Sequence, residues 1–600
     1  MLEPILRRTF MANMIVVSTL LCSPALPAVA QSASPSGTMP SIDARTAGMR
    51  HMPGFLPLHW EAKTGKLYLE IPRLGADMLY FDSLPYGTGS NDLGLDRGQV
   101  SRAKIVRFER FGPKVLLVQP NQFFRSSSAD SSERLAVRQS FPESILGSFG
   151  VAAENAEGGS VLVDATDFFV RDAHGVADEL VKQGTYKLDP ARSVIAIDAT
   201  KAFSKNTEVE SILTFASDAP IRGSLVGEVT PDAHAMTLRE HQSFLELPGP
   251  GYSPRRYDPR AGYFQFEFRD YAAALGEPLE QRFIVRHRLI KMDSGCTERC
   301  APVKPIQYYV DRGAPEPVRT ALVEGARWWD QAFQSAGWAP GTFRVDVLPE
   351  GADPMDVRYN IIQWVHRFTR GWSYGHPVAD PRTGEIIKGN VTLGSLRGRQ
   401  DYLIAESLLS PYVAGRKITP DNDPMLAMAL ARTRQLAAHE TGHTLGLAHN
   451  FAASAYPHDP AESVSVMDYP HPWITFAKDG SVDLASAYAA NIGIWDKVAI
   501  NYGYRQFADS SQEQAGLDAI LSGAAKAGLL YITDEDARPA ADRTACPGSS
   551  PQRIRRRRWD RRWAPFGPAA IRACDRIPGV WAETVSGAPR AASGIPRTRS

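Results

Sequence analysis

Three features are scarce in this chain of 600 residues: cysteine, an excess of charge of one sign, and long apolar runs. Lysine plus arginine number 67 and aspartate plus glutamate 66, so the formal net charge is +1 at pH 7. This balance does not favour nucleic acid as a partner. After the N-terminal segment no stretch is apolar for long enough to cross a bilayer, so we expect no integral membrane segment in the mature chain.

The N-terminus has the pattern of a secretory signal. Two arginines precede an apolar run over residues 11–22, and small residues lead to Ala30, after which we expect cleavage. A membrane anchor is the alternative, but the run is shorter than the ~20 residues that a spanning helix needs. A lipoprotein anchored at Cys22 fits poorly, because a bulky leucine precedes that cysteine. The sequence therefore predicts an exported protein, periplasmic or extracellular.

Composition and apolar patterning predict an α+β chain in which the character of the sequence changes several times. Short apolar and aromatic runs broken by turn residues predict a β-rich N-terminal domain, and alternating strand and helix patterns follow a Cys- and Pro-containing connector. The expected segments are a signal peptide over 1–30, a flexible leader over 31–50, the β-rich domain of unknown role over 51–290, the connector over 291–305, a catalytic domain over 306–510, a helical extension over 511–536 and a tail over 537–600.

The tail is rich in arginine and proline and has almost no apolar period. It predicts either a disordered basic segment that binds anionic surfaces or the out-of-frame ending of a GC-rich gene. We favour the second interpretation, because the change in composition near residue 536 is abrupt.

Within the expected catalytic domain, the pattern predicts strands and helices in alternation. A helix over 318–336 should end at Gly337, and a second helix should begin at Asp423-Pro424, an N-cap followed by proline at the first helical position. The expected strands cover residues 306–310, 343–348, 357–365 and 386–393.

The second of these helices leads into the strongest signal in the chain, His439-Glu440-Thr441-Gly442-His443-Thr444-Leu445-Gly446-Leu447-Ala448-His449. Four residues make about one helical turn, so His439 and His443 project from one face and Glu440 lies beside them. Gly446 can take a left-handed conformation without steric cost, and the resulting turn brings His449 round as a third ligand.

Three neutral imidazoles suit zinc and leave one coordination position for water, as a catalytic site requires. Zinc lowers the pKa of such a water, and Glu440 can accept its proton as general base. The sequence therefore predicts a zinc metallopeptidase, a hydrolase of protein or peptide substrates. The chance alternative, buried histidines that serve only the core, is disfavoured by the adjacent glutamate and the glycine-turned third histidine.

Eighteen residues after His449 comes Ser465-Val466-Met467-Asp468-Tyr469-Pro470. The extended zinc motif followed by this methionine turn resembles the metzincin clan of metalloproteases. The resemblance implies a zincin-like catalytic domain in which Met467 forms a hydrophobic base beneath the histidines. It also implies that Tyr469 contacts the metal or stabilises the oxyanion, with a core tyrosine as the alternative.

The stretch Ala448-His449-Asn450-Phe451 differs from the best-known branches of that clan. It is similar to the large exported bacterial zinc metalloproteases related to the EcxA-type zinc-binding domain, which also have a long N-terminal domain. The segment over 492–503 is similar to the helix that closes the lower subdomain in several metzincins. Neither resemblance predicts the peptide specificity or the oligomeric state.

Gly371-Trp372-Ser373-Tyr374-Gly375 matches the nucleophile elbow of serine hydrolases. That elbow must lead into a helix, whereas the prolines and glycine over 376–384 predict a loop, so we interpret the stretch as a substrate-side loop near an edge strand. His366, His376, His458 and His471 are interpreted as surface or loop histidines rather than ligands.

Cys296 and Cys300 form either a small disulfide ring or two free thiols, and as a pair they are too few for a structural zinc site. Two further hypotheses compete with an active peptidase. One is a non-catalytic zinc-binding protein whose N-terminal domain carries a binding role. The other is a latent enzyme in which the N-terminal domain or Cys296 blocks the metal.

Overall fold

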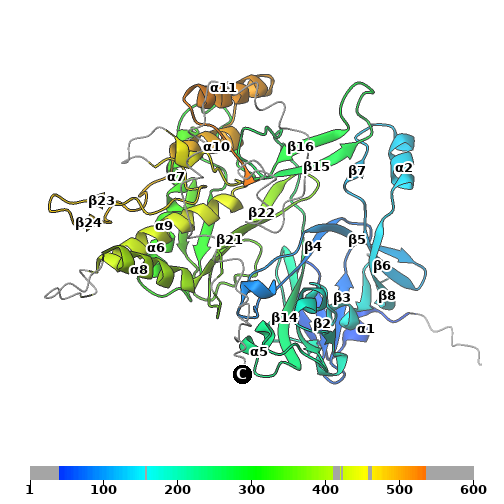
Figure 1. The fold of residues 1–600 in the computed structure, drawn as a ribbon. Coiled ribbons are helices and arrows are strands. Elements are labelled where there is room, and N and C mark those ends of the chain that lie inside the picture. The colour runs from blue at the N-terminus through cyan, green and yellow to red at the C-terminus, as the bar shows by residue number, and fades with distance from the viewer. Residues whose placement is uncertain are drawn as a thin grey trace, which may run out of the picture. The chain divides into compact units, whose positions relative to one another are not determined.

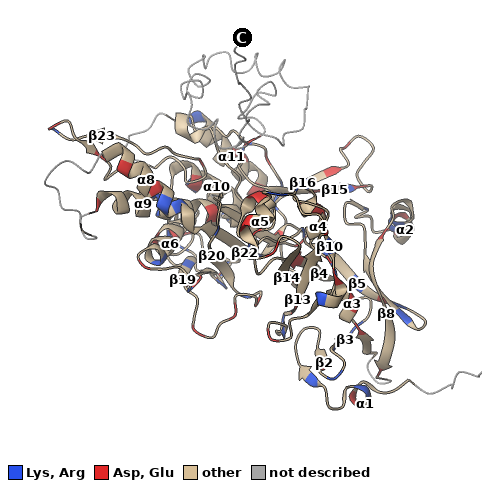
Figure 2. Ribbon diagram, turned by 60° about the horizontal axis from the view of Figure 1, so that its bottom comes forward, with Lys and Arg blue, Asp and Glu red and all other residues tan. Residues whose placement is uncertain are grey.

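A computed structural model of the chain describes residues 39–155, 159–369, 371–409, 419, 423–456, 463–507 and 509–534. The expected signal peptide, the tail over 537–600 and His458 lie outside these residues. No described helix is both long enough and apolar enough to span a bilayer. Acidic and basic residues are interspersed along the described elements (Figure 2).

The N-terminal half is dominated by an antiparallel sheet, which confirms the β-rich region (Figure 1). Among the described residues this sheet has 13 strands, in the order β1-β2-β3-β9-β8-β6-β5-β4-β14-β13-β10, with β11 and β12 also paired to β13. The strands are β1 (Arg50–Met52), β2 (Leu58–Glu61), β3 (Lys66–Ile71), β4 (Met78–Ser83), β5 (Lys104–Phe111), β6 (Lys114–Gln119), β8 (Ser144–Glu154), β9 (Val161–Asp164), β10 (Lys187–Leu188), β11 (Val194–Ile195), β12 (Lys201–Ala202), β13 (Asn206–Ala216) and β14 (Ala235–Leu245).

Short helices cover this sheet, and a small sheet of three strands, in the order β16-β15-β7, lies beside it. The first helix falls in the segment that the sequence predicts as a flexible leader; there Ile42 is buried and its N–H donates to Asn155 Oδ1. The elements are α1 (Ile42–Thr46), α2 (Ser131–Ser140), α3 (Thr166–Phe169), α4 (Val176–Glu179), α5 (Leu225–Val229), β7 (Phe124–Arg125), β15 (Gln265–Asp270), β16 (Glu280–Ile284) and the 3-10 turns η1 (Asn91–Leu93), η2 (Leu180–Lys182) and η3 (Pro190–Arg192).

The second half is built on a six-stranded sheet in the order β17-β22-β20-β18-β19, with β21 paired to β22. All its ladders are parallel except the one between β21 and β22. Among the described residues β21 has a ladder with β22 alone, and we call its other edge, which carries no ladder in these residues, the open edge. The strands are β17 (Arg286–His287), β18 (Ile306–Val310), β19 (Phe343–Val347), β20 (Asn360–Val365), β21 (Tyr374–Ala379) and β22 (Glu385–Gly394).

Helices α6 and α9 run side by side along this sheet (Figure 1). The expected single helix over 318–336 is broken at Trp328, so α6 and α7 are separate, and α8 was not predicted from the sequence. The remaining elements are α6 (Val318–Arg327), α7 (Trp329–Ser335), α8 (Ser395–Leu409), α9 (Pro424–Thr444), α10 (Ile494–Tyr504), α11 (Glu513–Lys526), β23 (Thr475–Phe476), β24 (Val482–Asp483), η5 (Ala453–Ala455) and η6 (Ser510–Gln512).

The core around α9 draws on residues that precede the expected catalytic domain. Tyr263, Ile284 and Leu289 are buried in the same cluster as Trp329 and Phe333. The Tyr263 hydroxyl donates to Ala499 O at 2.9 Å, and His287 N–H donates to the Tyr504 hydroxyl at 3.0 Å. The segment before the connector is therefore part of the core that surrounds α9, and local sequence patterns alone do not predict this.

Candidate metal centre

The helix α9 starts where the sequence predicts and delivers two histidines to one site. Asp423 caps it by accepting from the N–H groups of Met425 and Leu426, and Pro424 occupies the first turn. His439 and His443 are one turn apart on the buried end of the helix. With His449 they form a cluster in which one ring nitrogen from each lies within 4.8 Å of the others.

The turn after α9 depends on Gly446, as the sequence predicts. Its φ is +101°, a left-handed value, and a Cβ there would collide with the carbonyl oxygen of Val285. The segment 262–264 holds this turn through two backbone bonds: Ala448 N–H donates to Gly262 O and Phe264 N–H donates to Gly446 O, at 2.9 and 2.7 Å. The turn, and with it the third histidine, is thus fixed by residues far upstream.

Each histidine is oriented through its Nδ1 atom. His439 Nδ1 lies 2.6 Å from Val466 O, His443 Nδ1 lies 2.8 Å from Leu447 O, and His449 Nδ1 lies 2.9 Å from a carboxylate oxygen of Asp534. These oxygens can only accept, so each Nδ1 carries a proton, and in a neutral imidazole the lone pair is then on Nε2. Three Nε2 lone pairs on one cluster are what a metal ion requires.

Burial keeps the imidazoles of His439 and His443 neutral. It lowers the pKa of His443 to about 4 and that of His439 well below its usual value, and the neighbouring imidazoles lower both further. The Nε2 atom of His439 is buried and has no hydrogen-bond partner among the described residues. An orphaned nitrogen of this kind is costly unless a ligand occupies it, so the cluster fits a metal ion that prefers nitrogen ligands, such as zinc.

Glu440 lies on the same turn as the histidines and is buried. Burial raises the pKa of its carboxyl to about 8, although Arg432 and the backbone N–H of Gly375 favour the charged form. Its Oε2 atom has no partner among the described residues. Gly375, in β21, approaches so closely that a Cβ there would collide with the backbone oxygen of Glu440. The carboxylate therefore sits between the cluster and the open strand.

Met467 and Tyr469 both lie close to the residues of the histidine cluster. Met467 is buried, and its Sδ packs against Gly442 of α9, where a side chain would collide with it. The Tyr469 hydroxyl lies 2.7 Å from His449 Nε2 and its side chain is half-exposed. Asp496 holds the methionine turn from below, since its carboxylate accepts from Val466 N–H and from the Ser465 hydroxyl.

The serine-hydrolase interpretation of residues 371–375 is wrong. The stretch runs into β21 instead of a helix, so the loop expected over 376–384 begins only after Ala379. The Ser373 hydroxyl accepts from Gly394 N–H at 3.4 Å, and no hydrogen bond to a histidine is seen for it in the described part of the chain. The resemblance to the elbow is coincidental.

The remaining candidates stay outside the cluster. His366, His376 and His471 are exposed and none belongs to the three-histidine group. Cys296 and Cys300 form a disulfide, which settles the alternatives left open by spacing. A thiolate of Cys296 therefore does not block the metal site in this state.

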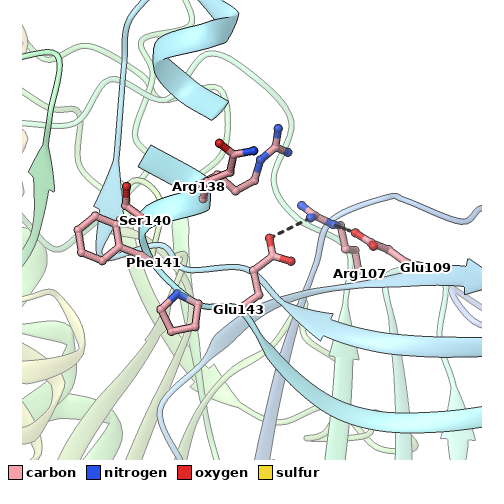
Figure 3. A pocket seen from close by; sticks show the side chains of 8 residues that line it. Arg107, Glu109, Arg138, Ser140, Phe141 and Glu143 are labelled. Carbon is pink, nitrogen blue, oxygen red and sulfur yellow. Dashed lines mark hydrogen bonds and ion pairs between the residues drawn. The ribbon is translucent and has the colours of Figure 1, made fainter. Parts of the chain in front are cut away.

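A separate hollow of about 610 Å³ lies in the β-rich region between α2 and β5 (Figure 3). Its charged groups are largely paired, since Arg107 bonds both Glu109 and Glu143, at 2.5 and 3.4 Å. It contains none of the histidines. The histidine cluster at the end of α9 is a different site.

Sequence reasoning missed Asp534, Gly375 and Asp496. Each acts on the site across a long stretch of chain, and a lone aspartate or glycine carries no local signal of such a role. Asn450 differs from the residue at this position in the best-known metzincins. That difference was the sequence signal for its contacts with Leu530 and Ile532.

The comparisons with known families agree with this geometry. The family described as Met-zincin matches residues 421–550, which include the three histidines, and a domain of unknown function (DUF5117) matches residues 98–292. No curated protein and no solved structure matches the chain. The Met-zincin match and the histidine triad together define a metzincin-like domain in the C-terminal half.

Proposed function

We propose that this chain is a zinc-dependent metalloendopeptidase. The observation that carries the proposal is the juxtaposition of three Nε2 atoms with the buried, partly unpartnered carboxylate of Glu440. Three imidazoles are a ligand set of catalytic zinc sites. Bound zinc would supply Lewis-acid chemistry, polarising a substrate carbonyl and making water nucleophilic at neutral pH.

The residues of the chain account for the proton movements. Glu440, buried beside the histidines with one carboxylate oxygen that has no partner among the described residues, accepts the proton of the attacking water and passes it to the leaving amine. Tyr469 reaches the site with a half-exposed hydroxyl and donates a hydrogen bond to the oxyanion. Met467 supports the histidines from beneath. These roles are those that the metzincin resemblance implies.

The open edge of β21 supports a peptide substrate. An extended chain can add to an unpaired strand edge through main-chain hydrogen bonds, which bind without reading sequence. Because Gly375 of this strand lies against Glu440, a bound peptide would pass the carboxylate. We further propose that the protein belongs near the EcxA-type branch and acts after export, in the periplasm or outside the cell, as its first 30 residues suggest.

The test is hydrolysis of casein by the chain lacking residues 1–30, beside Glu440→Gln, with zinc content measured in both. Glutamine keeps the size of the side chain and removes its proton-accepting charge. Activity in the parent that is lost in a zinc-loaded Glu440→Gln supports the proposal. Equal zinc with no activity in either protein would overturn it in favour of a binding-only or latent protein.

A further inference from the structure

The segment after α11 returns to the third histidine. Phe451 N–H donates to Ile532 O at 3.0 Å, and Ile532 N–H donates to Asn450 Oδ1 at 3.2 Å. Asp534, two residues after Ile532, contacts His449, so three consecutive residues of the histidine loop are bonded by this segment. We call residues 529–534 the C-terminal strap.

Apolar packing fixes the C-terminal strap independently of any metal. Its four residues from Leu529 to Ile532 pack against a buried cluster that contains Ala453, Tyr456 and Trp495. The Tyr531 ring stacks on Trp495 with a centroid distance of 5.6 Å and an angle of 13°. These contacts hold the strap in place without a metal ion.

Asn450 joins the strap to the histidine loop. Its side chain is fully buried and donates to the Tyr456 hydroxyl at 2.8 Å and to Leu530 O at 3.2 Å. Its Oδ1 accepts from Ala452 N–H and Ile532 N–H. An amide is needed here because it donates and accepts at once, which explains why asparagine follows the third histidine.

The three histidines are not held equally. His439 and His443 are oriented by backbone carbonyls, whereas His449 Nδ1 lies 2.9 and 3.1 Å from the two carboxylate oxygens of Asp534. A carboxylate on the far nitrogen of a ligating histidine fixes its ring and raises its basicity. We infer that Asp534, presented by the C-terminal strap, is the positioning residue of the third metal ligand. This inference rests on the proposed zinc centre but not on hydrolysis.

The test measures zinc affinity by competition with a chromophoric chelator, so it needs no turnover. Asp534→Ala should weaken zinc binding by about 10–100-fold, the usual effect of removing such a partner. Asp534→Asn, whose oxygen accepts the same hydrogen bond without charge, should fall between Ala and the parent. Asp518→Ala is the matched control, since Asp518 is an exposed carboxylate on α11 whose contact is Arg260 at 3.6 Å.

A second readout separates positioning from general stability. The thermal midpoint of the metal-free protein should be the same in Asp534→Ala and the parent, because the Asp534 side chain is 63% exposed. Cobalt in place of zinc should show a changed visible spectrum in Asp534→Ala but not in Asp518→Ala. Equal zinc affinities of Asp534→Ala and Asp518→Ala would overturn the inference alone, and a parent that binds no zinc would overturn it together with the proposed function.

Discussion

The Tyr469 hydroxyl is a polar group of the site that lies outside helix α9, on a half-exposed side chain. It approaches His449 Nε2 at 2.7 Å from the methionine turn and remains half-exposed. A group in this position can turn toward a substrate oxygen without breaking any element of the fold.

Removing this hydroxyl tests its role. We expect Tyr469→Phe to lower kcat by about 100-fold, the order found when one oxyanion donor is lost, with little change in KM. Zinc affinity should stay within a few-fold of the parent. Steady-state kinetics on a quenched fluorescent peptide would measure this, and a Tyr469→Phe enzyme with parental kcat would contradict the oxyanion role.

A second residue-scale feature lies far from the metal. Glu240 in β14 is fully buried, one of its oxygens accepts from the N–H groups of Ala173 and His174, and the other has no partner among the described residues. Burial, helped by the nearby charge of Asp172, raises its pKa from 4.5 to about 8.

Because the pKa of Glu240 is higher in the folded state than in the unfolded state, its contribution to stability is complete below about pH 4.5 and is lost as the pH rises toward 8. Glu240→Gln removes this titration. We expect the difference in unfolding free energy between Glu240→Gln and the parent to move by about 3–4 kcal/mol in favour of the variant from pH 5 to pH 8. Urea unfolding of metal-free protein at both values measures it; a pH-independent difference would contradict the raised pKa.

At the scale of elements, the contact of β21 with α9 requires a glycine. We expect Gly375→Ala to cost about 1–3 kcal/mol of stability and to abolish hydrolysis, since its Cβ would meet the Glu440 backbone and lie 3.0 Å from His443 Cβ.

Gly398 in α8 is the matched position for that substitution, because a Cβ there meets no atom within 4 Å. Gly398→Ala should raise stability by about 0.5–1 kcal/mol through helix propensity and leave activity unchanged. Chemical unfolding of both variants gives the comparison. If the two alanines had the same effect, the close approach of strand and helix would be wrong.

Local sequence patterns predicted the features that are determined by residues close together in the sequence. The cap at Asp423-Pro424, the histidine spacing and the turn at Gly446 were all visible, because each follows from residues within one or two helical turns. The break at Trp328 and the strand β21 were not, since tertiary packing and the ladder with β22 decide them. Asp534 was missed for the same reason: it meets His449 across 85 positions of sequence.

At the scale of the whole molecule, the N-terminal sheet is joined to the six-stranded sheet by a buried ion pair. Arg367, which follows β20, binds both carboxylate oxygens of Asp96, at 2.6 and 3.0 Å, and both side chains are almost fully buried. The Tyr374 hydroxyl, at the start of β21, donates to the same carboxylate at 3.0 Å.

Breaking this pair should be costly, because Arg367 would keep a buried charge without its partner. We expect Asp96→Asn to lower the free energy of unfolding by about 3–5 kcal/mol. Asp92→Asn, at an exposed carboxylate in the same loop, should change it by less than about 0.5 kcal/mol. Equal urea midpoints for the two variants would show that the N-terminal region is not anchored through Asp96.

The contacts that hold the histidine loop also determine when, during folding, the metal site can form. The loop needs the backbone of Gly262 and Phe264 from one side and Asn450 with Asp534 from the other, so its supports span more than 270 positions. A growing chain that ends at His449 contains all three histidines. It still lacks Asp534 and Ile532, which bond His449 and Asn450. Stable metal binding therefore follows the synthesis of residue 534 and its folding against the histidine loop.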